Sequence, residues 1–535
     1  MSYFSIEFCM FAIILFVAYF VCPKSKQWIC LLIFSYAFYL FFSIKLAVFL
    51  LITTFSIYAA AISMQNKNER ASEIIKKNKG VWEREERKKF KEAVNRRNRI
   101  TIVIALFLNF GILAFFKFYG VASDTFNSVS GQALLPKLNL ILPLGISFYT
   151  FQAVGYLIDV YRGAITAERN IAKFALFLSF FPQILQGPIS TYSQLAHQLY
   201  EPHRLSFANF KHGAELILWG VFKKLVIADR AWVVLSQFTE DVYSYNGTTI
   251  TFMVFLYALQ LYADFAGGID ISRGIAQILG IDMIDNFRRP YFAVSLGDYW
   301  RRWHISLGAW MKNYVFYSIS LSKASANVSK RLKNSKFGKS SFGSHVSKVL
   351  PSAFASLIIF ILVGIWHGAG WKFVVYGLWN GIILMMSTIL APVYKSTNRL
   401  LHINEEAFLF RLFRIARTFL LVYIGYVIDL APNMKGAMIM FRNMLFDQNF
   451  SVAYEQIKGM PLFKDEYVLL LICSFVLLIV GIIQETHKDT TIRDMLDQKT
   501  FMLRWVIIYA GVMAIIVLGT YGPGYNPADF VYMQF

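Results

Sequence analysis

Long apolar blocks recur along this chain of 535 residues, and short polar or basic segments separate them. A helix needs about 20 mostly apolar residues to cross a bilayer, and roughly 14 blocks approach that length. They lie near residues 5–22, 28–44, 46–63, 100–119, 139–160, 171–190, 211–234, 249–265, 303–320, 351–366, 371–391, 410–431, 466–484 and 503–520. Because several are short or interrupted by charge, we expect roughly 11–14 transmembrane or re-entrant helices. The pattern predicts an all-α polytopic integral membrane protein, with residues 1–535 in a single membrane-embedded domain.

Two basic segments predict the orientation of these helices. Residues 65–99 carry 13 Lys and Arg against 6 Glu, and residues 323–348 carry 7 Lys and Arg with no acid. Basic loops stay on the cytoplasmic side of a membrane, so both segments are expected there. Counting spans outward then places the N-terminus outside, residues 485–502 inside and the tail 521–535 outside.

Composition narrows the class of protein. Charged residues make up 16% of the chain, below the roughly 25% that is usual in soluble domains, which argues against an ordinary soluble enzyme. Aromatic residues make up 17%, which excludes a disordered chain. The formal net charge of +21 follows from the basic loops, so we expect a lipid bilayer around the protein and no nucleic acid as a partner.

Two of the eight histidines lie among aromatic residues in or beside predicted membrane segments. An ionisable side chain at that depth is costly and indicates function. Spacings of three and four place Trp300, Trp303 and His304 on one face of a continuous helix, with Arg301 and Arg302 on another.

His367, the second of these histidines, follows Trp366 between the apolar runs 351–366 and 371–391. Three glycines around it allow a tight turn, so a helix break inside the membrane is expected there. For either histidine the alternative is a core residue that is hydrogen-bonded to a carbonyl. No metal is expected, because no HExxH, Cys–His pair or acidic cluster with ligand spacing occurs.

Five motifs in order make the chain resemble the membrane-bound O-acyltransferase (MBOAT) family, and within it the alginate O-acetyltransferase membrane subunits of bacteria. They are LPLGISFYTFQ at 142–152, FPQILQGPI at 181–189, YADFAGGID at 262–270, WRRWHISL at 300–307 and IWHG at 365–368.

The resemblance implies a ring of tilted helices with a central tunnel, in the cytoplasmic membrane. It also implies that His367 is catalytic and that His304 is essential or nearly so. The implied activity is transfer of an acetyl group from a cytoplasmic thioester, acetyl-CoA or a carrier-bound acyl group, to an extracellular polysaccharide or cell-wall polymer. An extracellular acetyl-transfer partner protein is expected to complete the transfer.

The C-terminus reads Phe-Val-Tyr-Met-Gln-Phe at 530–535. This resembles the end of a small membrane partner in teichoic-acid D-alanylation, where the tyrosine is a proposed acyl relay. We therefore hypothesise that Tyr532 accepts the acetyl group near His367. The alternative is an aromatic tail packed at the membrane interface.

Other polar residues near the motifs have two interpretations. Arg301 and Arg302 can meet the phosphates of the donor or can mark the cytoplasmic side, and Arg302 can also pair with Asp298 one helical turn away. Asp264 lies in an apolar setting, where it can orient a histidine or an arginine or can pair two helices.

Three rival functions remain at this stage. The nearest is a D-alanyl or other acyl transferase fed by a carrier protein. Rivals of another class are a polymer exporter without chemistry and a non-catalytic membrane scaffold. An exporter predicts a wide pore lined by many polar residues, whereas this chain has few intramembrane charges.

Overall fold

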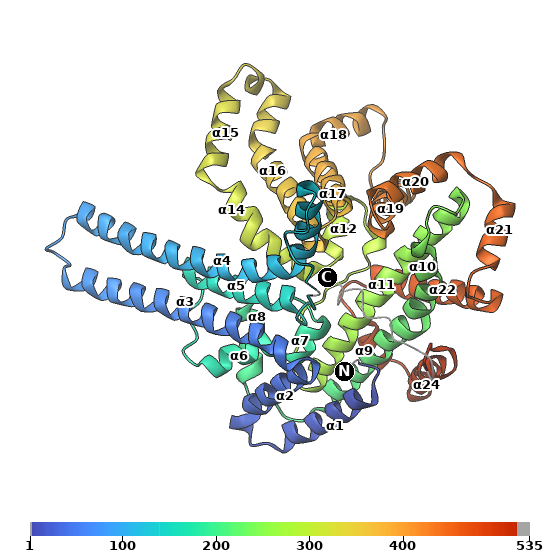
Figure 1. Ribbon diagram of the computed structural model, residues 1–535, viewed down its shortest axis with the longest axis horizontal. Helices are drawn as coiled ribbons and strands as arrows, with labels where there is room; N and C mark the ends of the chain where they lie inside the picture. The colour runs from blue at the N-terminus through green and yellow to red at the C-terminus, as the bar shows by residue number, and fades with distance from the viewer. Residues whose placement is uncertain (1–2, 139, 522–535) are drawn as a thin grey trace. The chain divides into compact units, whose positions relative to one another are not determined.

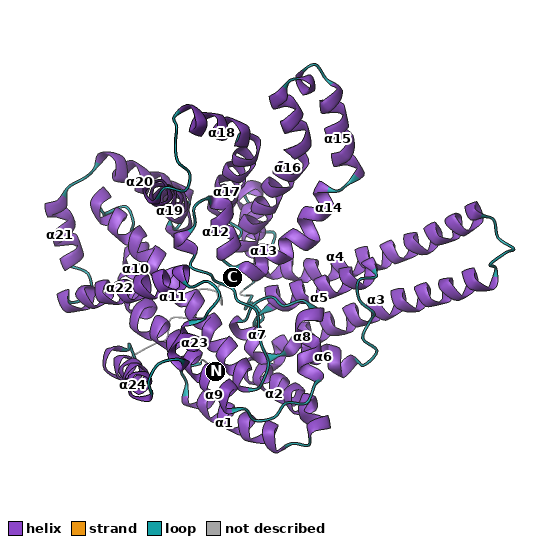
Figure 2. Ribbon diagram, turned by 180° about the vertical axis from the view of Figure 1, so that it is seen from behind, coloured by secondary structure: helices purple, strands orange, loops and turns teal. Residues whose placement is uncertain are grey.

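The computed structural model describes residues 3–138 and 140–521. In this part of the chain the regular structure is helical, and the one β pairing is an isolated antiparallel bridge between Phe287 and Trp303 (Figure 2). The all-α class predicted from the apolar blocks is thereby confirmed.

Contacts divide the chain into two compact units, which are described separately. The first comprises Met1–Ala214 and Ser272–Ile284, and the second comprises Glu215–Ile271 and Asp285–Phe535. The single domain expected from the sequence stays a prediction.

The first unit contains the N-terminal helices. They are α1 (Ile6–Val21), η1 (Lys24–Lys26), α2 (Gln27–Phe42), α3 (Ile44–Lys77), α4 (Arg84–Ser130), α5 (Ile146–Arg162), α6 (Ile171–Ser179), α7 (Phe181–Gln186) and α8 (Tyr192–Tyr200). Two further helices, α9 (Phe207–Val221) and α11 (Gly247–Ile278), contribute residues to both units.

The second unit contains the remaining helices. They are η2 (Phe222–Ala228), α10 (Asp229–Glu240), η3 (Pro290–Phe292), α12 (Leu296–Arg302), α13 (Ile305–Trp310), η4 (Met311–Phe316), α14 (Tyr317–Ser320), α15 (Lys323–Asn334), η5 (Phe337–Lys339), α16 (Ser341–His367), α17 (Trp371–Ile389), α18 (Ala391–Leu400), α19 (Phe408–Leu430), α20 (Met434–Phe446), α21 (Phe450–Lys458), α22 (Lys464–Thr486), α23 (Ile492–Asp497) and α24 (Phe501–Leu518). Of these, η2 and η4 are π-helices.

Among the described residues, 8 helices are long and apolar enough to cross a membrane. They are Lys24–Phe42, Ile44–Lys77, Arg84–Ser130, Gly247–Ile278, Ser341–His367, Trp371–Ile389, Lys464–Thr486 and Phe501–Leu518. The block predicted at 303–320 is one helical run over residues 305–320, in which the middle part, η4, is a π-helix. A helix shorter than a full span is tolerated in a membrane where protein shields it.

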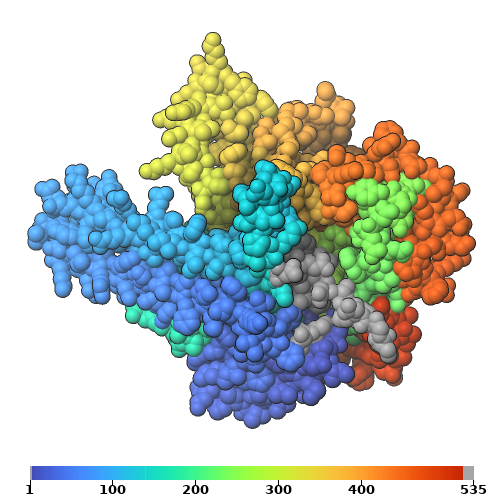
Figure 3. Space-filling view, viewed as in Figure 1, coloured from blue at the N-terminus to red at the C-terminus, as the bar shows by residue number. Residues whose placement is uncertain are grey.

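The first unit contains a long helical hairpin in which α3 and α4 run side by side (Figure 1). Ser43 caps α3, and a capping box of Glu83 and Glu86 begins α4. The half of the hairpin nearest the turn carries the basic segment 65–99, and it projects past the other helices of its unit (Figure 3). Charged side chains on many sides suit a helical pair in water rather than in hydrocarbon.

In the second unit α16 and α17 pack together through glycines. A Cβ atom at Gly364 would lie 2.2 Å from the carbonyl oxygen of Phe373, and one at Gly377 would lie 2.3 Å from that of Phe360. The two backbones therefore meet without side chains between them, as small residues allow between membrane helices. This close contact fixes the turn between the two helices.

Candidate active site around two histidines

His367 is the last residue of α16, and α17 begins at Trp371. The helix break predicted from the glycines around His367 is confirmed. The amide of Gly368 still bonds to the carbonyl of Gly364, at 3.4 Å, so the helical pattern ends directly after the histidine. His367 is half-buried there.

Aromatic rings bring the two histidines to one cluster. The Trp366 ring is buried, and its centroid lies 5.1 Å from that of His367 and 6.1 Å from that of His304. The ring of Phe265 meets His304 edge-on at 5.0 Å, and Tyr376 lies 5.8 Å from His367. Residues far apart in the sequence thus form one aromatic enclosure, and both histidines lie in it.

The continuous helix predicted through His304 is wrong. Helix α12 ends at Arg302, His304 adopts a left-handed backbone with φ 47° and ψ 54°, and α13 begins at Ile305. Such a conformation costs a residue other than glycine about 1–3 kcal/mol and persists only where its surroundings hold it. It turns His304 away from the helical face it would share with Trp303.

Asn286 holds the left-handed turn. Its side-chain oxygen accepts from the backbone N–H of Ser306 at 3.0 Å and from the Ser306 hydroxyl at 2.9 Å. Its backbone carbonyl accepts from the N–H of Ile305 at 3.0 Å. Because Ser306 N–H can only donate, the atom facing it must be the oxygen of the amide.

This arrangement also selects a tautomer of His304. The same Asn286 oxygen lies 3.3 Å from Nδ1 of His304, so Nδ1 must carry the hydrogen. In the neutral ring, Nε2 is then the acceptor nitrogen.

Replacing Asn286 with alanine is expected to slow turnover at this site about 10- to 100-fold, because misplacing a reacting group by about 1 Å has that effect. The change removes the acceptor of the Nδ1 hydrogen and the anchor of Ser306. Initial rates of the reaction at this site would measure it. The control is Asn98→Ala, which removes a similarly buried amide from the first unit. Equal rates in the two variants would contradict the assignment.

The other predicted aromatic residues lie around the same turn. Trp300 donates from Nε1 to the Asn380 side chain at 3.1 Å. Trp303 is buried and stacks on Tyr299, with ring centroids 5.6 Å apart. These contacts join α12 to α17 and pack the residues just before His304.

Arg301 and Arg302 have different surroundings. The side chain of Arg301 is 72% exposed, with a long contact of 3.4 Å to Asp298. Arg302 pairs with Asp298 at 3.1 Å, as its spacing predicted, and also with Glu485 at 2.9 Å. Glu485 lies near the end of α22 and was missed by sequence reasoning. An acid close to the end of an apolar span is the signal that could have found it.

Asp264 belongs to a buried ionic group. Its carboxylate lies 2.6 Å from the ammonium of Lys224, which also lies 2.8 Å from Asp229. All three side chains are at most 3% exposed. Lys224 belongs to the π-helix η2, a form that frequently marks functional sites. Asp264 lies on α11, so its ion pair with Lys224 joins α11 to η2, which is the helix-pairing role considered for it.

Two further predictions concern Tyr532 and metal ions. Tyr532 lies outside the described residues. Among the residues that the structure does describe, no group of three or more His, Cys, Asp and Glu side chains could hold a metal ion.

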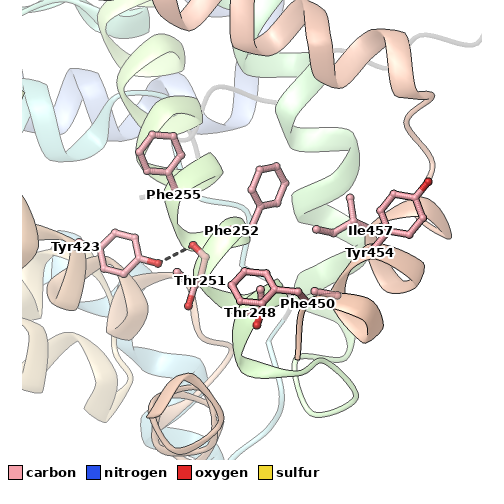
Figure 4. Close-up of a pocket in the computed structure, with 9 residues that line it drawn as sticks. Thr248, Thr251, Phe252, Phe255, Tyr423, Phe450, Tyr454 and Ile457 are labelled. Carbon is pink, nitrogen blue, oxygen red and sulfur yellow. Dashed lines mark hydrogen bonds between the residues drawn. The ribbon is translucent and has the colours of Figure 1, made fainter. Parts of the chain in front are cut away.

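An open pocket of about 510 Å³ lies in the second unit, and none of the residues predicted for the site lines it (Figure 4). It is lined by Thr248, Thr251, Phe252, Phe255, Tyr423, Phe450, Ala453, Tyr454 and Ile457. The hydroxyl of Tyr423 donates to the carbonyl of Thr251 at 2.6 Å in its wall. Its apolar lining contains neither histidine.

Comparison with known proteins finds similarity to the same family that the motifs resemble. Residues 164–332 match MBOAT, the membrane-bound O-acyltransferase family. The chain is 30% identical over 353 residues to a probable alginate O-acetylase of Pseudomonas syringae pv. tomato. The aligned region covers 64% of this chain and 60% of that relative.

Two other relatives are named for different substrates. A peptidoglycan O-acetyltransferase of Helicobacter pylori is 28% identical over 383 residues, 66% of each chain. A teichoic acid D-alanyltransferase of Bacillus subtilis is 26% identical over 254 residues, 46% of this chain and 60% of the relative. The chain thus spans about three fifths to two thirds of the length of these curated relatives.

Proposed function

Because the chain carries a domain of the membrane-bound O-acyltransferase family, we propose that it transfers an acetyl group across the cytoplasmic membrane. The donor is a cytoplasmic thioester, and the acceptor is an extracellular polysaccharide or cell-wall polymer. The observation that carries the proposal is the pair of histidines beside Trp366, one at a helix break and one in a left-handed turn. Two of the three relatives are named for O-acetylation of such polymers.

In the proposed reaction His367 is the general base. It accepts the proton of an attacking hydroxyl while the hydroxyl oxygen forms a bond to the thioester carbonyl carbon. The carbon–sulfur bond breaks, and the leaving thiolate takes the proton from the imidazolium, so atoms and charge balance. A base of this kind contributes about 10²–10⁴-fold. His304 is proposed to act beside it as a neutral ring with an acceptor Nε2.

For the donor side we propose a thioester that carries phosphate, either acetyl-CoA or a carrier-bound acyl group. Arg301, whose side chain is 72% exposed, offers a guanidinium group that can bind phosphate with two hydrogen bonds, whereas Arg302 is held by Asp298 and Glu485. Trp300, Trp303 and Trp366 are proposed as apolar walls that keep water from the thioester. Asp264 is proposed to support this region through its bond to Lys224 rather than by touching the donor.

The function is tested with membrane vesicles from cells that express the chain and from cells that lack it. Labelled acetyl-CoA and a labelled acyl carrier protein are supplied to the cytoplasmic side in separate reactions. Alkali-labile acetate on the surface polymer should appear only in vesicles that contain the chain. Equal labelling in both preparations would refute the proposal.

The alternative function is acyl transfer of another kind, such as D-alanylation fed by a carrier protein. We consider this alternative because the chain is also similar to a teichoic acid D-alanyltransferase. Label from D-alanyl carrier, but not from acetyl-CoA, would then reach the polymer. The same assay therefore separates the two donors.

Tyr532 is proposed to be the hydroxyl that attacks the thioester near His367; its acetyl ester then passes the acetyl group to the extracellular partner and regenerates the phenol. A phenol beside a base can act as the nucleophile in this step. Tyr532→Phe is expected to lower polymer acetate to the level of cells without the chain, at equal membrane abundance. The control is Tyr521→Phe, at the last described residue. Unchanged acetate in Tyr532→Phe, or the absence of an acetyl-tyrosine peptide by mass spectrometry, would remove the relay.

A further inference from the structure

The segment that carries His304 is a closed loop. The N–H of Arg288 donates to the carbonyl of Arg302 at 2.9 Å, and the N–H of Ile305 donates to the carbonyl of Asn286 at 3.0 Å. These two bonds form a neck on either side of the Phe287–Trp303 bridge. The position of His304 therefore depends on how the loop between the two sides of the neck is held.

Two residues of the loop have an unfavourable backbone. Arg289 has φ 51° and ψ 60° and directly precedes Pro290, while His304 has φ 47°. A residue before proline is normally restricted to extended conformations, so the left-handed shape of Arg289 needs support from elsewhere. Asn286 supplies that support at His304.

One carboxylate on another helix reaches both sides of the loop. Oε2 of Glu485 lies 3.0 Å from Nε of Arg289 and 2.9 Å from Nη1 of Arg302. Oε1 lies 3.1 Å from Nη2 of Arg411, on α19. The side chain of Glu485 is 6% exposed, so these bonds form largely out of contact with water.

We propose that Glu485 is a positioning residue for His304. By bonding to Arg289 and Arg302 together, it holds the two sides of the neck in register and keeps Arg289 left-handed. Arg302 lies two residues before His304, so a change in its position is passed along the backbone to the histidine. The inference rests on the proposed function only for its consequence on catalysis, because the clamp itself is a property of the loop.

A binding role for the exposed cations beside Glu485 predicts a different result. Arg411 and Lys488 lie 3.1 Å and 3.6 Å from Oε1 of Glu485 and are 49% and 58% exposed, so both remain accessible to an anionic donor. If Glu485 chiefly set the affinity of these cations for donor phosphate, its replacement would change KM and leave kcat alone. The positioning role instead requires kcat to fall.

Glu485→Gln tests the proposal by steady-state kinetics of acetyl transfer in vesicles. We expect kcat to fall about tenfold or more, because misplacing a reacting group lowers the rate by that much. KM for the donor should stay within about twofold of the wild-type value. Glu485→Asp should recover part of kcat because it keeps the charge. The matched control is Glu466→Gln, an ion-paired glutamate on the same helix whose partner is Arg230. A change in KM alone, or an unchanged kcat, would overturn the proposal.

A second measurement does not depend on activity. Hydrogen–deuterium exchange of the purified full chain should rise in peptides spanning 286–305 for Glu485→Gln and stay at the wild-type level for Glu466→Gln. Unchanged exchange there would also overturn the clamp. If wild-type vesicles transfer no acetyl group while the exchange result holds, the proposed function fails and the clamp stands.

Discussion

Replacing His367 with glutamine is expected to reduce acetyl transfer to the polymer by about 10²–10⁴-fold, the usual contribution of a general base. Glutamine keeps a polar side chain of similar reach, but its amide cannot take up a proton at physiological pH. His367 is the last residue of α16, so the substitution does not change the interior of the helix. The expected loss is therefore chemical rather than structural, and kcat should carry it.

The measurement is alkali-released acetate from the surface polymer at matched amounts of protein in the membrane. Tyr376→Phe is the control, since it keeps the ring that lies 5.8 Å from His367 and removes only a hydroxyl. Acetate near the wild-type level in His367→Gln, with lower acetate in cells without the chain, would identify His367 as structural. The scaffold or exporter interpretation would then take precedence.

The site shows where sequence reasoning succeeds and why. The break at His367 was predictable because glycine is a local signal, and the Asp298–Arg302 pair was predictable because helical spacing alone brings the two residues together. The fold class followed from the apolar blocks, because their length indicates helices in a bilayer and does not depend on any particular side-chain contact.

The turn at His304 was not predictable in the same way. The run of tryptophans there has helical spacing, and the hydrogen bonds that end the helix come from Asn286, 18 residues earlier. Glu485 lies 183 residues after Arg302, its bonding partner. Side chains so distant in the sequence leave no periodic signal, so the reshaping of the loop becomes visible only in three dimensions.

The buried lysine of η2 gives the largest expected effect on stability. Lys224→Met would leave the carboxylates of Asp229 and Asp264 buried without the ammonium that lies 2.8 Å and 2.6 Å from them. Removing one member of a buried ionic group destabilises a protein by about 3–5 kcal/mol, because the remaining charge stays out of water. Like charges brought together in this way also repel each other. We expect a lower midpoint of thermal unfolding in detergent and less protein in the membrane.

The compensating variant separates charge from packing. Adding Asp229→Asn and Asp264→Asn to Lys224→Met removes both carboxylates, so much of the lost stability should return if charge is the cause. Lys458→Met is the control, because its pair with Glu455 is exposed and such pairs contribute about 0–1 kcal/mol. If Lys224→Met unfolds at the same temperature as Lys458→Met, the ionic group does not stabilise the contact between η2 and α11. If the triple variant is no more stable than Lys224→Met, lost packing rather than unpaired charge explains the effect.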